Sequence, residues 1–466
     1  MFAAEPTGVS VNTITRNTEI NRGDHFVNKI KNTHRFVAET KQWHVYGQGV
    51  WAPVELKRVQ GEALEFIKSQ AELIAKIPDE RDRADATNEY RAYAKKAGIS
   101  NLTDLASIKL IENIDKFDSD DLAMCMNNCW VNLFNGRSNP PDPTKFFSLS
   151  TNAAFREGAV APLWRKTIDE VFKGDSDLAS YFQKAVGYSM LGGNNEQVLF
   201  ICHGAGANGK SLLLETIRDV FGSYGQSMPI STLMRGKQNQ SGASPEVARL
   251  RGIRFALAAE TEKGQRWSAN RIKTLTGNDT IASRALYQDM IEFKSKATIW
   301  VACNHKPEVD AADAAMWRRI RLIPFERVFK PEEQDADLSS KLQKERDGIM
   351  TWMIQGLLMY QAQGLEEPKS VTLATEQYRN EMDSVKRFIA EAADRDPEAR
   401  ETVSDIKDRY KEWCRDEGLL PLPASSFNKA LEDHGCRQTK SGNVRYWSGL
   451  KLIDELERDF KLAQGF

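Results

Sequence analysis

The chain has 466 residues, which is enough for about three domains with complete hydrophobic cores. Its 64 lysine and arginine residues balance its 65 aspartate and glutamate residues, giving a formal net charge of −1. This balance excludes a uniformly basic protein, so local basic patches must hold any nucleic-acid partner. The sequence shows no signal peptide, no apolar run of roughly 20 residues, and six scattered cysteines. These features predict a cytoplasmic protein with reduced thiols and no membrane partner.

The N-terminal part of the sequence predicts a flexible arm followed by an accessory domain. Residues 1–22 are polar and rich in threonine and asparagine, which is typical of a poorly ordered arm. Residues 35–53 alternate apolar and polar side chains around a Gly-Gln-Gly turn, which predicts a small β-hairpin element. Residues 56–130 are rich in helix-forming residues with apolar positions at helical spacing. The polar, proline-bearing stretch 135–143 predicts a linker, so we assign residues 23–143 to the accessory domain.

A helical collar is expected next, over residues 144–192. The apolar spacing predicts two helices between residues 163 and 191, with a break near Gly174. The second helix leads into the strand that opens the central domain, which we assign to residues 193–330.

A phosphate-binding loop is the most specific signal in the chain. The apolar strand 198–202 precedes the loop and the amphipathic helix 211–217 follows it, which is the required order. Glycines let the backbone turn so that successive N–H groups face a phosphate at a helix N-terminus. Lys210 is expected to reach the β and γ phosphates of ATP, and the Ser211 hydroxyl to bind Mg²⁺. The alternative is a glycine-rich turn that matches by chance. The loop consists of Gly204, Ala205, Gly206, Ala207, Asn208, Gly209, Lys210 and Ser211.

A second nucleotide signal is the apolar strand 253–259, which is followed by Glu260 and Glu262. In phosphate-loop ATPases, one acid at the end of a neighbouring strand holds Mg²⁺ and another polarises the attacking water. Glu260 and Glu262 are the candidates, and the sequence leaves the division of roles open. We place Glu260 beside Ser211 among the metal-binding candidates. The alternative is an ordinary strand end with solvated acids.

Two further catalytic candidates follow a third apolar strand, residues 297–303. Asn304 ends this strand, where it could sense the γ-phosphate and position water. We assign water activation to a glutamate rather than to His305, because a lone histidine at a strand end is more often structural. Arg318 and Arg319 precede another strand, and either guanidinium could stabilise phosphoryl charge in a neighbouring subunit. The alternative is an arginine pair that only decorates the surface.

The C-terminal residues 384–466 predict a winged-helix domain, in which a β-wing over residues 436–447 follows three short helices. Four basic residues and no acidic ones lie between Cys436 and Lys451, so a local charge of +4 predicts DNA contact. The alternative is a protein-docking module in which Trp447 is only part of the wing core. The predicted helices span 388–393, 404–417 and 425–434, and the DNA-binding candidates are Arg437, Lys440 and Arg445.

Together these motifs resemble the superfamily III helicases of the phage and plasmid primase-helicase family, which also resemble the poxvirus primase-helicase. The resemblance implies an α/β fold: an AAA+ P-loop ATPase core, completed by the helical segment 331–383, with a helical N-terminal and collar region and a C-terminal winged helix. The matching stretches are 204–211, 260–262, 272–284, 304–307 and 317–325.

The resemblance also implies the activity and the assembly. It implies an ATP- and Mg²⁺-dependent DNA helicase that forms a homo-oligomer, usually a hexamer, and moves 3′ to 5′ on single-stranded DNA. Its place would be the replication-origin DNA of a phage, plasmid or integrated mobile element in the cytoplasm of a bacterial host. A primase or a polymerase is the expected protein partner.

In this family a β-hairpin ahead of the residue equivalent to Asn304 projects into the ring channel and grips DNA. Residues 281–296 supply cations and an aromatic ring suited to phosphates and bases. Asp289 near the tip departs from the lysine or histidine that relatives often carry there. An edge hairpin without DNA contact is the alternative. The candidates for contact with DNA are Arg284, Tyr287, Lys294 and Lys296, together with Lys273, which could also face the nucleotide.

Two other function classes stay open. A phosphate-loop kinase would act as a monomer on a small acceptor and would have no need for Asn304 and the arginine pair. A non-unwinding, ATP-driven initiator or regulator would share every site, bind an origin and recruit a host helicase. The sequence does not separate this initiator from a helicase.

Overall fold

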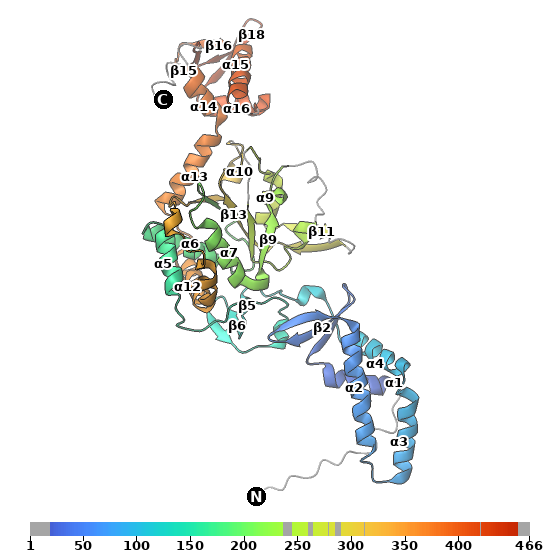
Figure 1. Cartoon of the computed structure of the whole chain (residues 1–466). Coiled ribbons are helices and arrows are strands. Elements are labelled where there is room, and N and C mark those ends of the chain that lie inside the picture. The colour runs from blue at the N-terminus through green and yellow to red at the C-terminus, as the bar shows by residue number, and fades with distance from the viewer. Residues whose placement is uncertain are drawn as a thin grey trace.

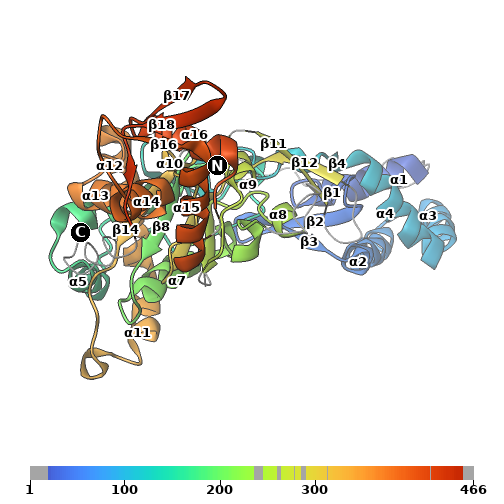
Figure 2. The same cartoon turned by 90° about the horizontal axis from the view of Figure 1, so that it is seen from above.

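The computed structural model describes residues 19–235, 245–259, 264–277, 279–284, 290–311, 313–419 and 421–454. These residues form an elongated molecule with a helical N-terminal region at one end, a central α/β domain, and a small C-terminal domain at the other end (Figure 1). Seen from above, the N-terminal helices extend to one side of the central domain (Figure 2). Across the described ranges, no helix has the length and apolar character needed to span a membrane.

The N-terminal region is a four-stranded sheet packed against helices. Strands β1, β2 and β3 pair antiparallel, and β4 joins β1 in parallel. Phe26, Trp43 and Phe66 come from a helix, the sheet and a second helix, and all lie in one buried cluster. The elements are α1 (Glu19–Ile30), β1 (His34–Val37), β2 (Gln42–Gly47), β3 (Val50–Val54), α2 (Leu56–Ile74), α3 (Glu80–Tyr93), α4 (Lys96–Lys109) and β4 (Ile111–Glu112).

Two predictions for this region need correction. Helix α1 begins at Glu19, so the arm expected over residues 1–22 ends earlier, and residues 1–18 lie outside the described part. The stretch 135–143 is not a free linker, because it contributes β7 to a three-stranded antiparallel sheet. Gly136 makes this possible, since its φ of 68° allows the turn between the paired strands. The elements are η2 (Ile114–Lys116), β5 (Ala123–Cys125), β6 (Trp130–Asn132), β7 (Arg137–Asn139) and η3 (Pro143–Lys145).

Two cations attach this segment to the central domain. Arg254, which is 1% exposed, donates hydrogen bonds to the main-chain oxygens of Asp120 and Asp121 at 3.2 and 3.0 Å. Lys296 donates to the main-chain oxygen of Asp118 at 2.8 Å and pairs with the Asp121 carboxylate at 2.5 Å. A buried guanidinium without these acceptors would be costly, so the contact fixes the segment against the amino end of the central sheet.

The central domain contains a five-stranded parallel sheet in the order β14-β8-β13-β10-β9, which agrees with the expected α/β fold. Strand β8 lies between β13 and β14, and β10 lies on the far side of β13. A separate hairpin, β11–β12, stands outside this sheet. The elements are β8 (Leu199–His203), α7 (Lys210–Phe221), η4 (Gly222–Tyr224), β9 (Gly225–Pro229), η5 (Ile230–Thr232), α8 (Pro245–Ala248), β10 (Phe255–Ala259), α9 (Ala269–Thr276), β11 (Thr280–Arg284), β12 (Met290–Lys294), β13 (Thr298–Cys303), α10 (Ala314–Trp317) and β14 (Ile320–Pro324).

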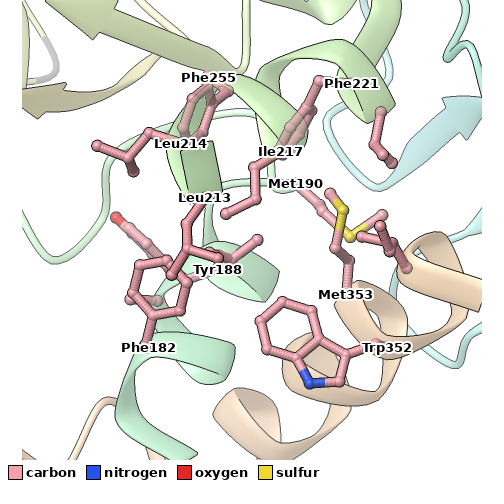
Figure 3. Packing of buried hydrophobic residues seen from close by; sticks show 14 of the residues in the cluster. Phe182, Tyr188, Met190, Leu213, Leu214, Ile217, Phe221, Phe255, Trp352 and Met353 are labelled. Carbon is pink, nitrogen blue, oxygen red and sulfur yellow. The ribbon is translucent and has the colours of Figure 1, made fainter. Parts of the chain in front are cut away.

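A helical layer covers one face of this sheet. The predicted pair of helices is present as α5 and α6, separated at Gly174, whose φ is 76°. Phe182 from α6, Leu213 from α7 and Trp352 from α12 meet in the largest buried cluster (Figure 3). The elements are α5 (Pro162–Val171), α6 (Ser176–Tyr188), η7 (Pro331–Glu333), α11 (Leu338–Lys344), α12 (Arg346–Gln363) and α13 (Lys369–Met382).

Helices α6 and α12 cross in close contact because glycines occupy the crossing. A Cβ atom on Gly187 would lie 2.1 Å from the main-chain nitrogen of Leu357, and one on Gly356 would lie 2.2 Å from the main-chain oxygen of Gln183. Both obstacles are backbone atoms, which cannot rotate away. The crossing therefore excludes any larger side chain at either glycine.

The C-terminal domain has a core of its own, built from three helices and a three-stranded sheet in the order β16-β18-β17. Phe388, Tyr410, Phe427 and Trp447 lie in this core, and Trp447 is fully buried. All three helices predicted from the sequence are present, with ends shifted by a few residues. The elements are α14 (Ser384–Ala392), β15 (Ala393–Asp394), β16 (Arg400–Thr402), α15 (Val403–Asp416), α16 (Ala424–Asp433), β17 (Arg437–Ser441), β18 (Val444–Ser448) and β19 (Lys451–Leu452).

We predict that Gly356→Ala lowers the free energy of unfolding of the central domain by about 1–3 kcal/mol, because the new methyl group must push α6 and α12 apart. Gly61→Ala is the matched control, since Gly61 is exposed in α2 and a Cβ there meets nothing within 4 Å. The control should be neutral or stabilising by about 0.5–1 kcal/mol. Urea unfolding followed by circular dichroism measures both, and equal stabilities would contradict the close crossing.

Candidate active site

The phosphate-loop sequence forms a tight turn between β8 and α7. Gly206, Ala207 and Gly209 have positive φ values of 109°, 49° and 77°, and α7 begins at Lys210. A Cβ atom on Gly204 would lie 2.2 Å from the Asn208 Nδ2 atom and 2.3 Å from the main-chain oxygen of Phe325. Glycine at 204 and 209 is therefore a steric requirement of this turn.

The turn presents main-chain donors at the start of a helix. No described residue accepts a hydrogen bond from the main-chain amides of residues 205–209. Unpaired amides at a helix N-terminus attract anions, because the donors and the helix dipole act in the same direction. The residues present therefore fit a phosphate group, as the sequence predicts.

Lys210 lies at the centre of this turn and is 5% exposed. Its Nζ atom donates a hydrogen bond to the Asn304 Oδ1 atom at 2.7 Å and to the Gly204 main-chain oxygen at 3.2 Å. Burial lowers the pKa of Lys210, because the charged form loses solvation. Two predicted site residues, separated by 94 positions, are thus brought together.

The adjacent parallel strands explain this meeting. His203 at the end of β8 is aligned with Cys303 at the end of β13, so the residues that follow both strands lie at one edge of the sheet. Strand β10 ends at the same edge, since Ala259 is aligned with Ala302. Glu260 and Glu262, which follow β10, lie outside the described residues.

Ser211 is exposed in the first turn of α7, one residue beyond the lysine. Its hydroxyl group fits the predicted role of an oxygen ligand to Mg²⁺, because a hard cation takes oxygen donors. Together with an acid from the end of β10, it would hold the ion beside the phosphate groups and balance their charge.

The sequence did not reveal how the loop after Asn304 is held. Lys306 pairs with Glu381 of α13 at 2.7 Å. The Tyr378 hydroxyl donates to the Pro307 main-chain oxygen and accepts from the Trp267 Nε1 atom at 3.1 Å. Helix α13 therefore fixes the position of Asn304 from more than 70 residues away, as no local pattern could indicate.

The two arginines before β14 occupy different environments. Arg319 is 6% exposed and donates to the Thr276 Oγ1 atom at 3.1 Å, the Ala315 main-chain oxygen at 2.7 Å and the Gln197 Oε1 atom at 3.3 Å. Arg318 is exposed at the end of α10. The buried arginine is thus satisfied within its own subunit, which leaves Arg318 as the candidate for contact with a neighbour.

Their position excludes a role at the phosphate loop of the same subunit. Ile320, the next residue, is aligned with Leu199 at the amino end of β8, whereas the phosphate loop follows the carboxyl end. A strand of this length spans roughly 16 Å. The arginines therefore lie at the opposite edge of the sheet from Lys210.

Two DNA-binding candidates are committed to internal contacts. Lys273 pairs with both carboxylate oxygens of Asp313 at 2.8 and 3.0 Å, which joins α9 to α10. Lys296 is bound to the segment 118–121, as described above. Both ammonium groups thus have acceptors within the chain, and their contact with DNA or nucleotide stays a prediction.

The predicted hairpin is present as β11–β12, with Thr280 aligned with Lys294. Lys294 is exposed on this hairpin. The Arg284 side chain, and Tyr287 with the rest of the tip, lie outside the described residues. The hairpin therefore offers one described cation, and its tip stays a prediction.

The wing cations of the C-terminal domain are exposed. Lys440 and Arg445 are direct partners across β17 and β18, and Arg437 lies on the same strand as Lys440. Like charges directly opposite each other repel, and no described carboxylate pairs with any of the three. An anionic partner would relieve this repulsion.

We predict that Arg319→Met lowers the free energy of unfolding by about 1–3 kcal/mol, because three acceptors, of which the Thr276 hydroxyl is buried, lose a charged donor. Arg318→Met should change it by less than about 0.5 kcal/mol, since that side chain is exposed. The measurement is the denaturation midpoint of each variant, compared with that of the parent protein. A reversed order would show that the two arginines have been assigned the wrong environments.

Two family models match the chain. The D5 N-terminal-like family (D5_N) matches residues 23–173, which include the N-terminal region and α5. A family of unknown function, DUF5906, matches residues 202–319, from the strand before the phosphate loop to the arginine pair.

Curated relatives are viral proteins. "Putative helicase L207/L206" of Acanthamoeba polyphaga mimivirus is 30% identical over 295 residues, which are 59% of this chain and 31% of the relative. "Putative helicase 022R" of Frog virus 3 is 27% identical over 296 residues, 59% of this chain and 30% of the relative. "Putative primase C962R" of African swine fever virus is 27% identical over 305 residues, 57% and 30% respectively. The chain thus spans just under a third of these relatives, and their eukaryotic hosts give no support to the expected bacterial host.

Solved structures show a similar fold. The apo A form of the NrS-1 C-terminal region has a TM-score of 0.51 and 11% identity, and the match covers 91% of this chain and 97% of that chain. A second apo structure of the same region has a TM-score of 0.50 and 10% identity, covering 91% and 98%. At this identity the likeness concerns the fold alone. The chain is thus similar to the D5 N-terminal-like family over residues 23–173, and over more than half of its length to viral proteins named putative helicases and primases.

Proposed function

We propose that the protein is an ATP-dependent DNA helicase of superfamily III that works in replication as a ring. The contact between Lys210 and Asn304 at the carboxyl edge of the sheet carries this proposal. A lysine in a glycine-rich turn can hold the terminal phosphates, and an amide beside it can detect whether the γ-phosphate is present. The strand order and the acids expected after β10 agree with an AAA+ core.

Each catalytic role follows from position. Lys210 and the amides of residues 205–209 bind phosphate oxygens, and Ser211 binds Mg²⁺ with an acid that follows β10. Glu260 and Glu262 supply this acid and the group that orients the attacking water. These roles stabilise charge on the transferred phosphoryl group without any covalent step by the protein.

Ring formation is supported by the position of Arg318. An exposed guanidinium at the edge opposite the phosphate loop cannot serve its own subunit, but it can reach a nucleotide that lies between subunits. Arg319 stabilises the α10–β14 turn through its hydrogen bonds to Thr276 and Ala315. We therefore take Arg318 as the arginine finger of a hexamer.

DNA contact is assigned to two elements. The β11–β12 hairpin stands outside the central sheet, where Lys294 and the tip can face a channel. The C-terminal domain has the helix and strand order of a winged helix, and its wing exposes Arg437, Lys440 and Arg445. Single-stranded DNA fits the hairpin, and duplex origin DNA fits the wing.

The alternative is a non-unwinding initiator that uses the same ATP cycle. The exposed wing favours it, because three cations without described partners could recognise an origin while another protein unwinds the DNA. The kinase alternative is less favoured, because it gives no role to Asn304 beside Lys210.

We predict that Lys210→Ala lowers ATP hydrolysis by roughly 10²–10³-fold and abolishes strand release, because phosphate charge loses its main counter-charge. Lys344→Ala is the control, since that lysine is exposed on α11. The assay follows strand release from a forked DNA together with phosphate release. DNA-stimulated hydrolysis without strand release in the parent protein would favour the initiator, and absence of hydrolysis would overturn both.

We predict that Arg318→Ala subunits and Lys210→Ala subunits, each inactive alone, recover part of the ATPase activity when mixed. In a mixed ring, some interfaces combine an intact phosphate loop with an intact finger from the neighbour. Activity is measured across mixing ratios, with mass photometry to confirm assembly. Absence of recovery in rings that do assemble would place the arginine outside the active site.

A further inference from the structure

The sheet order gives the phosphate loop two distinct flanks. On one flank β13 brings Asn304 to Lys210, so the terminal phosphate of a nucleotide belongs there. On the other flank lies β14, whose chain continues past Pro324 along the phosphate loop. A bound nucleoside triphosphate extends across the loop from its terminal phosphate. Its base must therefore lie toward the flank away from Asn304.

The chain after β14 is bonded to the phosphate loop at two points. The main-chain oxygen of Phe325 accepts a hydrogen bond from the Asn208 Nδ2 atom at 3.3 Å. The main-chain amide of Phe329 donates to the Ala207 oxygen at 2.7 Å. Residues 325–329 thus move with the loop that holds the phosphates.

Phe329 is placed beside the turn with part of its ring exposed. A Cβ atom on Gly209 would lie 3.7 Å from the Phe329 Cε2 atom and 2.7 Å from the Val171 Cγ2 atom. The ring is only partly buried, in contact with the main core of the central domain. The Phe329 ring edge is therefore within van der Waals reach of the phosphate loop at Gly209, while the conflict that excludes a side chain there is with Val171.

Ion pairing holds the ring in this position. The Arg327 guanidinium lies 5.0 Å from the Phe329 ring centroid and pairs with Glu333 at 2.7 Å. Glu333 also accepts a hydrogen bond from the Lys330 main-chain amide at 2.8 Å, which closes the turn after the ring. The Arg327 guanidinium lies over one face of the ring and the main core packs against it, so the rotation of the ring is restricted and little freedom is lost when a flat ligand stacks on its exposed part.

We propose that Phe329 is the platform on which the base of a bound nucleoside triphosphate stacks. This inference rests on the proposed function, because it concerns the same nucleotide. The ring provides a flat apolar surface and no hydrogen-bonding group. It therefore binds the face of a base and does not distinguish the hydrogen-bonding groups at the edge of that base. The ligand class is nucleoside triphosphates, with purines bound more tightly than pyrimidines because their larger rings bury more area.

The test compares ATP with inorganic tripolyphosphate, each with Mg²⁺, by titration calorimetry on the full chain. Tripolyphosphate has the phosphate chain without a base. Phe329→Ala should weaken ATP binding by about tenfold or more and leave tripolyphosphate binding unchanged. Phe329→Tyr keeps the ring and should restore ATP binding. Val328→Ala is the matched control, because Val328 is the neighbouring residue and is 58% exposed.

The outcomes separate this inference from the proposed function. Parent protein that binds neither ligand overturns the nucleotide site, and the platform with it. Lys210→Ala should weaken both ligands, which shows that the phosphate part of the site is intact in the parent. If Phe329→Ala weakens both ligands equally, or neither, the ring is not the base platform.

Discussion

The parallel pairing of β8 with β13 on one side and β14 on the other is the constraint on which the rest of the structure depends. This pairing places the carboxyl ends of the three strands at one edge of the sheet. The phosphate loop, Asn304 and the chain before Phe329 therefore meet there. The same pairing sends Arg318 to the opposite edge. A single sheet topology therefore brings Lys210 and Asn304 together and keeps Arg318 away from both.

The sequence predicted the phosphate loop, the hairpin and the C-terminal helices because each depends on local spacing, which sequence periodicity reports directly. It also assigned both Lys210 and Asn304 to the γ-phosphate, and the two side chains lie 2.7 Å apart. It gave no indication of contacts with distant partners. Lys296 had the charge of a DNA ligand, but its acceptors are 177 and 178 residues away, and the linker composition of 135–143 did not reveal that β7 pairs with β6.

The contacts of Lys296 connect the β11–β12 hairpin with the segment 118–121, although the two lie far apart in the sequence. The lysine follows β12 by two residues, so one end of the hairpin is bonded to the same segment, 118–121, that Arg254, the residue before β10, also binds. The root of the hairpin and the N-terminal region thus share a fixed point. A displacement of β12 along its own axis has to stretch or break the contact with Asp118 and Asp121.

A comparable connection runs from the carboxyl edge of the central sheet to the C-terminal domain. Lys306, two residues after Asn304, pairs with Glu381 near the end of α13, and the next helix begins only three residues later. Between them, Asp383 caps α14 through the Lys386 amide at 2.8 Å and binds the His434 Nε2 atom at 2.9 Å. The loop after Asn304 and the C-terminal domain are thus joined through α13 and Asp383. Tyr378 of α13 is fully buried in a core of the central domain, so packing as well as polar contacts supports this connection.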